Sequence, residues 1–432
     1  MFVSTLRLVN FRSYCDAIVG FGSGLNVVVG QNASGKTNLL EGAWFALRGS
    51  SPRTRREEKL ITWGERFARV ELALEGPATG PQAVEVGYAP GQGKRVHWNG
   101  VEIASLDELR GRSQVFIFVP ESLLLVKGSP ARRRAHTDTF AAALDPSYAG
   151  AARDLQGVLR QRNAQLLAVK NGASPAPLDP WDAQFAHAAA ELGRRRRDLV
   201  AELAERFAVT AAALAPEGQR FTIRLVSQLA AVDYDEAAVL DELRARRPGE
   251  TRRGVSSFGP QRDDLRFLEL ASDAADDPGL AARSPSQNDE TPAAGVLDRV
   301  VVAPGLSCGP VDLPSGGRDL RLFGSQGEQR AAVLALLLAE QQLAAARTGQ
   351  HGTLFLDDVM SELDDGRRRL LVRILASAGQ IIITTTDRHY FTEQELAEAT
   401  VIELPLGGSL ASGEAAPPAD EVRPAPPAAD AL

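Results

Sequence analysis

One eight-residue segment near the N-terminus constrains the fold more than any other feature of this chain. Residues 30–37 read GQNASGKT and match the pattern G-x-x-x-x-G-K-[ST]. The β-branched run Leu25–Val29 precedes the segment, and residues 38–47 follow it with helical spacing. A strand, a glycine-rich loop and a helix in this order are typical of a loop that wraps a phosphate chain. The segment therefore predicts an α/β nucleotide-binding domain.

The residues of this loop have predicted roles in holding ATP. Glycines let the backbone approach the phosphates, and the first amides of the following helix point at them. Lys36 is expected to reach the β- and γ-phosphates, and the Thr37 hydroxyl is expected to bind Mg²⁺. The candidate nucleotide ligands are Gly30, Gln31, Asn32, Ala33, Ser34, Gly35, Lys36 and Thr37.

A second part of the same site is predicted near the C-terminus. The apolar run TLFLDD ends at Asp357 and Asp358, and QIIITTT follows it after a polar helical stretch. Two such strands around a helix are typical of a parallel βαβ unit. A carboxylate at the tip of a buried strand can hold Mg²⁺, which is the role predicted for Asp357. Asp358 is then the candidate general base, and Lys36 is the third catalytic candidate.

The segment FGSQGEQR, residues 323–330, precedes a very apolar helix. Ser325 and Glu328 have the spacing of a capping box, which accounts for the start of that helix. Gly327 lies in the first turn, where glycine costs about 1 kcal/mol relative to alanine. A glycine at this position is explained if a ligand such as a phosphate approaches the backbone closely.

Composition excludes several classes of protein. The 432 residues are 44% hydrophobic, which suits a globular chain of two or three domains. The longest apolar run, Ala331–Ala339, is too short to cross a bilayer, and the N-terminus does not resemble a secretory signal. Cys15 and Cys308 cannot form a disulfide framework. We therefore expect a cytoplasmic protein that does not contact the membrane.

The net charge of −7 is unevenly distributed. Residues 269–299 and 403–432 carry −5 and −4, which leaves +2 for the rest of the chain. The composition of residues 271–296 and of the tail after Leu406 predicts disorder. Residues 121–266 hold 22 Lys/Arg against 19 Asp/Glu, with basic clusters at 132–134, 194–197 and 244–253. Such clusters can bind phosphates, although many are solvated helix faces. Charge alone therefore neither indicates nor excludes DNA binding.

The motifs together resemble the ABC-type ATPase heads of the SMC/Rad50/RecF group. Further matches resemble the RecF family within it: LRLVNFRSY, GQNASGKTNLLE, PESLLLVKGSPARRR, GPQRDDL, FGSQGEQR and LFLDDVMSELD. The resemblance implies an ATP-dependent DNA-binding protein of recombinational repair with weak ATPase activity. It also implies binding at gaps, where single- and double-stranded DNA meet, and action with RecO and RecR in loading RecA.

The resemblance also implies roles for individual residues. Ser325, Gln326 and Gly327 would form a signature that caps the γ-phosphate of a second protomer in an ATP-dependent homodimer. Residues 361–364 would be the D-loop, and residues 384–387 the switch region. Arg12 and Ser13 are expected near the nucleotide. Asp358 stands where most ABC ATPases have glutamate. The basic clusters supply the DNA-contact candidates Arg132, Arg133 and Arg134.

The expected fold is an α/β P-loop ATPase head of the ABC type with a discontinuous nucleotide-binding sheet and an inserted helical lobe. The predicted boundaries are 1–118 (first ATPase part), 119–268 (helical lobe), 269–317 (acidic insertion), 318–404 (second ATPase part) and 405–432 (tail). Prolines at 146, 175, 177, 180, 216 and 248 are expected to divide the helical lobe. Its longest proline-free stretch spans only about 50 Å, so no long coiled coil is expected.

Three other readings have less support. A transporter ATPase subunit would carry LSGGQ in place of FGSQGEQ and a histidine near Asp387. An SMC-type or Rad50-type DNA tether needs long heptad arms, which the proline-divided middle region does not provide. A P-loop kinase would have no use for a signature helix. Another SMC-like ATPase of DNA repair is the main alternative.

Overall fold

The computed structural model describes residues 1–76, 80–103, 105–175, 177–215, 218–270, 317–361, 363–376 and 379–405. The predicted acidic insertion and tail lie almost wholly outside these ranges, as does Glu362 of the predicted D-loop. The chain divides into two compact units. The first contains residues 1–109 and 380–432, and the second contains residues 110–379.

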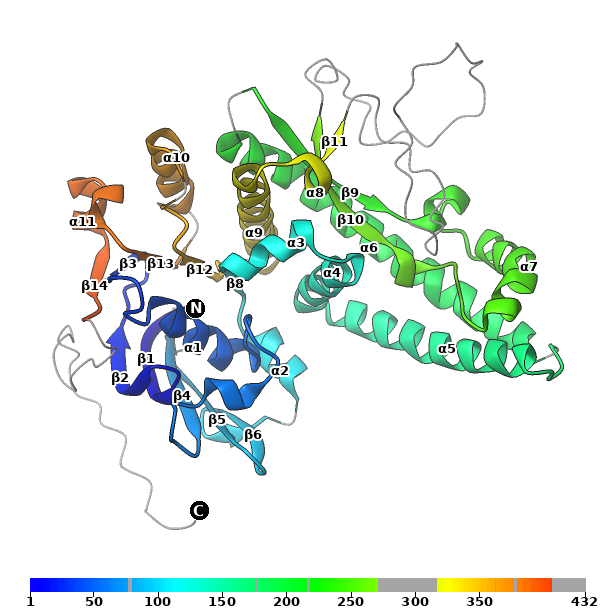
Figure 1. Cartoon of the computed structure of the whole chain (residues 1–432), viewed down its shortest axis with the longest axis horizontal. Coiled ribbons are helices and arrows are strands. Elements are labelled where there is room, and N and C mark those ends of the chain that lie inside the picture. The colour runs from blue at the N-terminus through cyan, green and yellow to red at the C-terminus, as the bar shows by residue number, and fades with distance from the viewer. Residues whose placement is uncertain are drawn as a thin grey trace. The chain divides into compact units, whose positions relative to one another are not determined.

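The first unit contains a six-stranded antiparallel sheet in the order β2-β1-β4-β5-β6-β7 (Figure 1). Its strands are β1 (Phe2–Phe11), β2 (Tyr14–Gly20), β4 (Ala68–Glu75), β5 (Gln82–Ala89), β6 (Gly93–Trp98) and β7 (Val101–Glu102). Alternate residues of β4 are buried, so one face of the sheet forms the core. Helix α1 (Lys36–Arg48) packs on that face against β1, β4 and β5.

Three parallel strands complete the first unit. Strand β3 (Leu25–Val29) lies between β13 (Ile381–Thr385) and β14 (Thr400–Glu403). All five residues of β13 are buried, as expected for a parallel strand covered on both faces. The short helices of this unit are η1 (Glu57–Leu60), η6 (Arg388–Tyr390) and α11 (Glu393–Glu398), and α2 (Leu106–Arg112) joins the two units in sequence.

The second unit is mainly helical. Its helices are η2 (Pro120–Leu123), α3 (Leu124–Lys127), α4 (Pro130–Leu144), α5 (Pro146–Lys170), α6 (Leu178–Leu214), η3 (Gln228–Val232), α7 (Glu236–Arg253), η4 (Pro260–Arg262), α8 (Leu320–Phe323), α9 (Gln326–Thr348) and α10 (Asp365–Ala376). The 37-residue α6 packs against α5, α7 and α9. Helix α6 therefore contacts both the inserted helices α5 and α7 and the helix α9, which carries the predicted signature.

Two small groups of strands belong to the second unit. Strand β12 (Thr353–Asp357) pairs in parallel with β8 (Val115–Phe118), and every residue of both strands is buried. Strand β10 (Asp264–Leu270) lies between β9 (Arg220–Val226) and β11 (Arg318–Asp319) in antiparallel pairing. The buried β12 places the two predicted carboxylates at its carboxyl end.

Most predicted elements near the motifs are confirmed. Leu25–Val29 is a strand, 38–47 lies within α1, and α4 begins at Pro130 with Ser129 as its N-cap. The prediction that Pro248 divides the helical lobe is wrong, because Pro248 lies inside α7. Pro180 lies in the first turn of α6, where the missing N–H would have no helical partner. Within the described residues, none of the helices is both long and apolar enough to cross a membrane.

Candidate functional site

The loop between β3 and α1 has the backbone of a phosphate-binding turn. Ala33 has a φ of +68° and Gly35 a φ of +98°, so two residues of the loop are left-handed. A Cβ on Gly35 would lie 2.7 Å from the Tyr14 hydroxyl, which itself donates to the Gly35 carbonyl. Gly35 is therefore required both by its conformation and by the close approach of Tyr14. Burial raises the pKa of Tyr14, so this donor stays protonated.

The start of α1 is suited to an anion. Its N-cap is Gly35, whose position offers no side-chain cap, and no acidic residue lies in its first turn. The Lys36 ammonium lies over the loop and donates to the carbonyls of Gly30 (2.6 Å) and Gln31 (2.9 Å). The buried Ser34 hydroxyl has no hydrogen-bond partner among the described residues. A helix terminus, a lysine and an unused donor in one loop fit a phosphate group.

Arg12 and Ser13 lie beside α1 in different ways. The Arg12 guanidinium donates to both carboxylate oxygens of the buried Glu41, at 2.7 and 2.9 Å. Ser51 and Arg53 also donate to Glu41. Ser13 accepts from the Asn38 side chain and lies next to Gly35. Ser13 is thus at the loop, whereas Arg12 is occupied by a carboxylate on the second turn of the helix.

The end of β13 is joined to the start of the loop. The Gly30 N–H donates to the Thr385 carbonyl at 3.1 Å, which brings residues 384–387 next to residues 30–37. Asp387 caps the turn that follows, and hydrogen bonds from the backbone and the side chain of His389 lower the pKa of Asp387. His389 was not predicted as a site residue. It lies two residues beyond Asp387, the position near which a transporter ATPase subunit would carry a histidine.

In the second unit, Asp357 and Asp358 differ in conformation. Asp357 is the buried last residue of β12. Asp358 has a φ of +47°, which is uncommon for a residue other than glycine and typical of functional sites. Its carbonyl accepts from Arg330 of α9 at 3.3 Å and from the Ser361 hydroxyl at 3.2 Å. These bonds connect the end of β12 with the predicted signature helix and the predicted D-loop.

The predicted capping box at the start of α9 is confirmed. Ser325 accepts from the Glu328 N–H, and Glu328 accepts from the Ser325 N–H. Burial raises the pKa of Glu328, but hydrogen bonds from Gln219 and Ser325 outweigh burial and lower it. Ser325, Gln326 and Gly327 are exposed, and no atom lies within 4 Å of a Cβ built on Gly327. The first turn of α9 is therefore accessible from outside.

The predicted site residues thus fall into two groups. Residues 30–37, Arg12, Ser13 and 384–387 belong to the first unit, and Asp357, Asp358 and the signature belong to the second. The described residues contain no cluster of three acidic, histidine or cysteine side chains that could hold a metal ion. Mg²⁺ commonly uses one or two protein oxygens together with phosphate oxygens. Thr37 and Asp357 supply oxygens of the kind that this coordination needs.

The structure changes the list of arginines available to DNA. Arg133 is buried, and its guanidinium binds both carboxylate oxygens of Asp264 and three backbone carbonyls. Arg134 is half-buried and donates to the Asp263 carbonyl, while burial and Arg196 lower its pKa. Arg132 is exposed. The proposal that all three reach DNA is therefore wrong for Arg133, whose burial depends on a partner 131 residues away.

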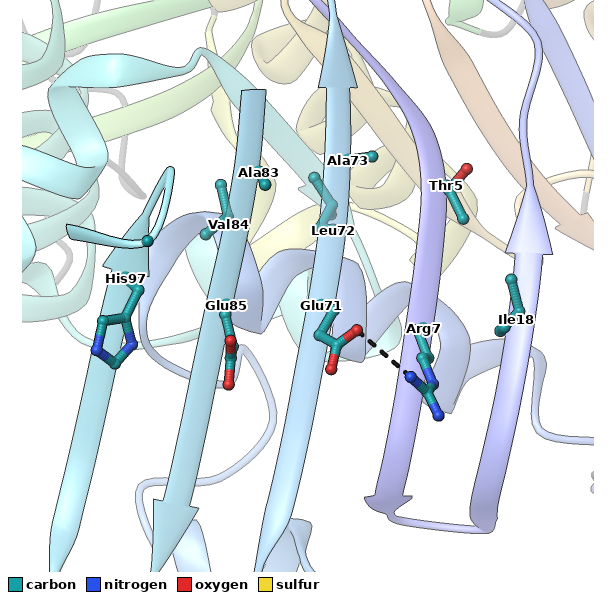
Figure 2. A pocket seen from close by; sticks show the side chains of 11 residues that line it. Thr5, Arg7, Ile18, Glu71, Leu72, Ala73, Ala83, Val84, Glu85 and His97 are labelled. Atoms are coloured by element: carbon teal, nitrogen blue, oxygen red, sulfur yellow. Dashed lines mark ion pairs between the residues drawn. The ribbon is translucent and has the colours of Figure 1, made fainter. Parts of the chain in front are cut away.

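A shallow hollow of about 430 Å³ lies on the face of the antiparallel sheet that α1 does not cover. Figure 2 shows Arg7, Glu71, Glu85 and His97 next to one another on four neighbouring strands of this face. Arg7 pairs with Asp16 at 3.0 Å and with Glu71 at 3.7 Å, so its charge is balanced locally. This face has none of the phosphate-binding features of the loop.

Known families and relatives show to which family the chain belongs. A family model described as RecF/RecN/SMC N terminal domain matches residues 2–403. The DNA replication and repair protein RecF of Halalkalibacterium halodurans is 32% identical over 422 residues, 96% of this chain and 100% of that protein. The chain belongs to the RecF family. RecF of Limosilactobacillus fermentum is 31% identical over 414 residues, 94% of this chain and 98% of its own.

Solved structures share the fold of this chain. A structure described as the recombination mediator protein RecF with ATP has a TM-score of 0.70 at 23% identity, covering 90% of this chain and 93% of its own. An SMC head has a TM-score of 0.50 at 15% identity, covering 93% and 94%. The predicted fold is confirmed: a RecF-like, ABC-ATPase-type α/β head with inserted helices.

Proposed function

We propose that this RecF-family chain is an ATP-switched DNA-binding protein of recombinational repair, with weak ATPase activity. The observation that carries the proposal is the phosphate-binding loop at the uncapped N-terminus of α1, with Lys36 lying across it. A RecF structure described as holding ATP shares the fold, which supports ATP as the nucleotide.

The nucleotide would be held by backbone amides and Lys36. Residues 30–35 would wrap the phosphates, Lys36 would neutralise their charge, and Thr37 and Asp357 would hold Mg²⁺. The ion would offset charge on the transferred phosphoryl group. Asp358 orients and deprotonates the attacking water as general base. Its carboxylate is one methylene shorter than glutamate, which favours slow turnover.

ATP would also join two copies of the chain. Ser325, Gln326 and Gly327 are exposed at the N-terminus of α9. The capping box occupies the N–H groups of Ser325 and Glu328, so an anion would bind at the N–H groups of Gln326 and Gly327. The γ-phosphate of a second copy is an anion of the required kind. Each copy then supplies a phosphate loop and a signature, giving a two-fold dimer with two sandwiched nucleotides.

We propose that the dimer binds DNA at gaps, where single- and double-stranded DNA meet, and assists RecA loading with RecO and RecR. Membership of the RecF family supports this role, since the relatives are DNA replication and repair proteins. A RecF structure of similar fold is described as part of the RecFOR pathway. Of the cluster Arg132–Arg134, the exposed Arg132 and the half-buried Arg134 remain candidates for DNA contacts.

Sedimentation with and without ATP and gapped DNA tests the proposal. The chain should sediment as a monomer alone, as a dimer with ATP and Mg²⁺, and together with DNA when ATP is present. Lys36→Met should weaken all three responses because the phosphates lose their main cation. A chain that ignores both ATP and DNA would contradict the proposal.

A further inference from the structure

We propose that the loop formed by residues 53–67 of the first unit binds single-stranded DNA, with one base stacked on Trp63. The inference rests on the DNA-binding function proposed above and gives it a specific surface. This surface, the Trp63 loop, lies outside the helical region that the sequence analysis favoured.

Trp63 is the most exposed large apolar side chain among the described residues, at 98%. Its backbone is nevertheless well anchored. The Thr62 N–H donates to the Asn10 carbonyl at 2.9 Å, and the Glu65 N–H donates to the Thr62 carbonyl at 3.0 Å. The Thr62 hydroxyl also donates to the Tyr14 carbonyl. The fold therefore holds an indole ring in water, which costs hydrophobic free energy unless a ligand covers it.

Four of the five cations near Trp63 in the sequence lack partners among the described residues, and the fifth, Arg53, pairs with Glu41. Residues 53–66 include five Lys/Arg and three Glu. Four of these cations are exposed, and within the described residues their side chains form no ion pair or hydrogen bond: Arg55, Arg56, Lys59 and Arg66. Glu57 pairs with Lys94, whereas Glu65 accepts only from the uncharged Asn10 amide. Glu58 and Glu65 therefore offset two of these four cations, and two positive charges remain. The loop thus presents uncompensated positive charge.

The basic clusters of the helical unit are different. Arg194 and Arg195 pair with Glu191, and Arg197 pairs with Asp198. In α7, Arg244 pairs with Asp241 and Arg246 with Glu242. A phosphate would have to displace a carboxylate at each of these arginines. At Arg55, Arg56, Lys59 and Arg66 of the Trp63 loop it would displace only water.

An exposed indole and free cations together match single-stranded nucleic acid. Bases of a single strand have open π-faces that stack on aromatic side chains, while their phosphates meet Lys and Arg. In a duplex the bases are already stacked on each other. A protein partner would need a broader apolar surface than Trp63 and the half-exposed Phe67 provide.

The loop is also connected to the phosphate-binding helix. The Arg12 N–H donates to the Leu60 carbonyl, and the Arg12 guanidinium donates to the Lys59 carbonyl. The same guanidinium binds Glu41 of α1. One side chain therefore links the helix that follows the nucleotide loop to the Trp63 loop.

Fluorescence anisotropy of labelled oligo-dT, with the full chain, ATP and Mg²⁺, tests the proposal. Trp63→Ala should weaken binding roughly 5- to 100-fold, the range measured for loss of one stacked base. Trp63→Phe should recover most of the affinity. Val101→Ala, at an apolar residue of the same unit that is 70% exposed, is the matched control and should bind normally. All variants should keep ATP-dependent dimerisation.

An abasic strand of the same length separates stacking from charge. Trp63→Ala should bind the abasic strand as well as the unchanged chain does, because no base remains to stack. Arg55→Ala and Arg66→Ala should weaken binding to both strands and lower the log–log salt slope by about 0.7 per lost contact. Arg244→Ala, which removes an exposed but paired arginine, is their control.

Each outcome has one meaning. If the unchanged chain binds oligo-dT but Trp63→Ala binds it equally well, the Trp63 loop is not the binding surface and the general DNA-binding function stands. Equal losses on normal and abasic strands would contradict stacking. If the unchanged chain binds no DNA in any nucleotide state, the proposed function itself fails.

Discussion

Asp358 shows how one residue joins chemistry to the fold. The backbone of Asp358 is left-handed, and its carbonyl accepts hydrogen bonds from Arg330 and Ser361. These features fix the direction in which its side chain leaves the backbone. We predict that Asp358→Asn keeps ATP and DNA binding but slows hydrolysis about 100-fold or more, because a general base typically contributes that much. Single-turnover hydrolysis of radiolabelled ATP measures this step directly.

The control for this variant is Asp365→Asn, which changes an exposed carboxylate in the same unit. It should hydrolyse ATP at the normal rate. Normal turnover in Asp358→Asn would remove Asp358 from the general-base role and leave the water to another group.

For single residues, the sequence predicts those roles that depend on nearby positions in the chain. The loop 30–37 and the capping box at Ser325 were predicted residue by residue, since their geometry is set within eight positions. Tyr14 and Glu41 were missed because their roles depend on segments 21 and 29 residues away. Trp63 was missed because an isolated aromatic residue in a sequence is usually a core residue.

Among the elements, helices α5, α6 and α7 are joined by buried charges. Asp182 of α6 accepts from Arg162 of α5 at 2.7 Å and also from Arg247 of α7. The side chains of Arg162, Asp182 and Glu250 are fully buried. Asp182→Ala should therefore destabilise the unit by about 3–5 kcal/mol, because it leaves a buried arginine with one partner fewer.

Asp179 provides a matched control on the same helix. It also pairs with Arg247, but its side chain is 65% exposed. Asp179→Ala should lower the urea midpoint far less than Asp182→Ala does, since water replaces an exposed partner. Urea unfolding followed by fluorescence measures both values, and equal losses would contradict the role assigned to burial.

A second contact between elements should depend on pH. His136 of α4 lies 2.8 Å from Glu340 of α9. Burial lowers the pKa of His136, but the charge and hydrogen bond of Glu340 outweigh burial and raise it. A raised pKa stabilises the folded state fully below the ordinary value of about 6.5, and this stabilisation is lost as pH rises through the folded value.

We therefore predict that His136→Ala loses more stability at pH 6 than at pH 9. The difference in urea midpoint between the variant and the unchanged chain measures this loss at each pH. His187→Ala, which removes an exposed histidine beside Glu236, should change the midpoint little. An equal loss for His136→Ala at both pH values would show that packing, and not charge, carries the contact.

The elements themselves were predicted well wherever hydrophobic periodicity is strong. The buried strands β3, β12 and β13 are examples, because apolar runs bounded by turns have few alternatives. Pro248 was misjudged because tertiary contacts hold α7 together around it. The balance of charges between helices was not predictable, since each pair needs knowledge of the packing.

For the whole molecule, the central prediction concerns assembly. Ser325→Arg places a bulky side chain where the γ-phosphate of ATP bound to a second copy would lie. ATP-driven dimerisation should be lost, while ATP binding to the monomer should remain, because the phosphate loop lies in the other unit. Analytical ultracentrifugation and nucleotide binding measure the two effects separately.

Two controls separate bulk from helix capping. Ser325→Ala removes the hydroxyl and the cap at a cost of about 1 kcal/mol without adding bulk, so it should impair dimerisation less than Ser325→Arg does. Thr392→Arg makes the same kind of change at the capping box of α11, which belongs to the other unit. Normal ATP-driven dimerisation of Ser325→Arg would rule out the sandwiched arrangement.

The pairing of β3 has a consequence for the synthesis of the chain. Both neighbours of β3, and the carbonyl that holds Gly30, come from residues beyond 380. The ribosome synthesises the loop 30–37 early, but the strands that pair beside it are synthesised only some 350 residues later. At typical elongation rates that delay is on the order of tens of seconds. Nascent or prematurely terminated chains that lack residues 381–403 therefore cannot complete the proposed ATP site.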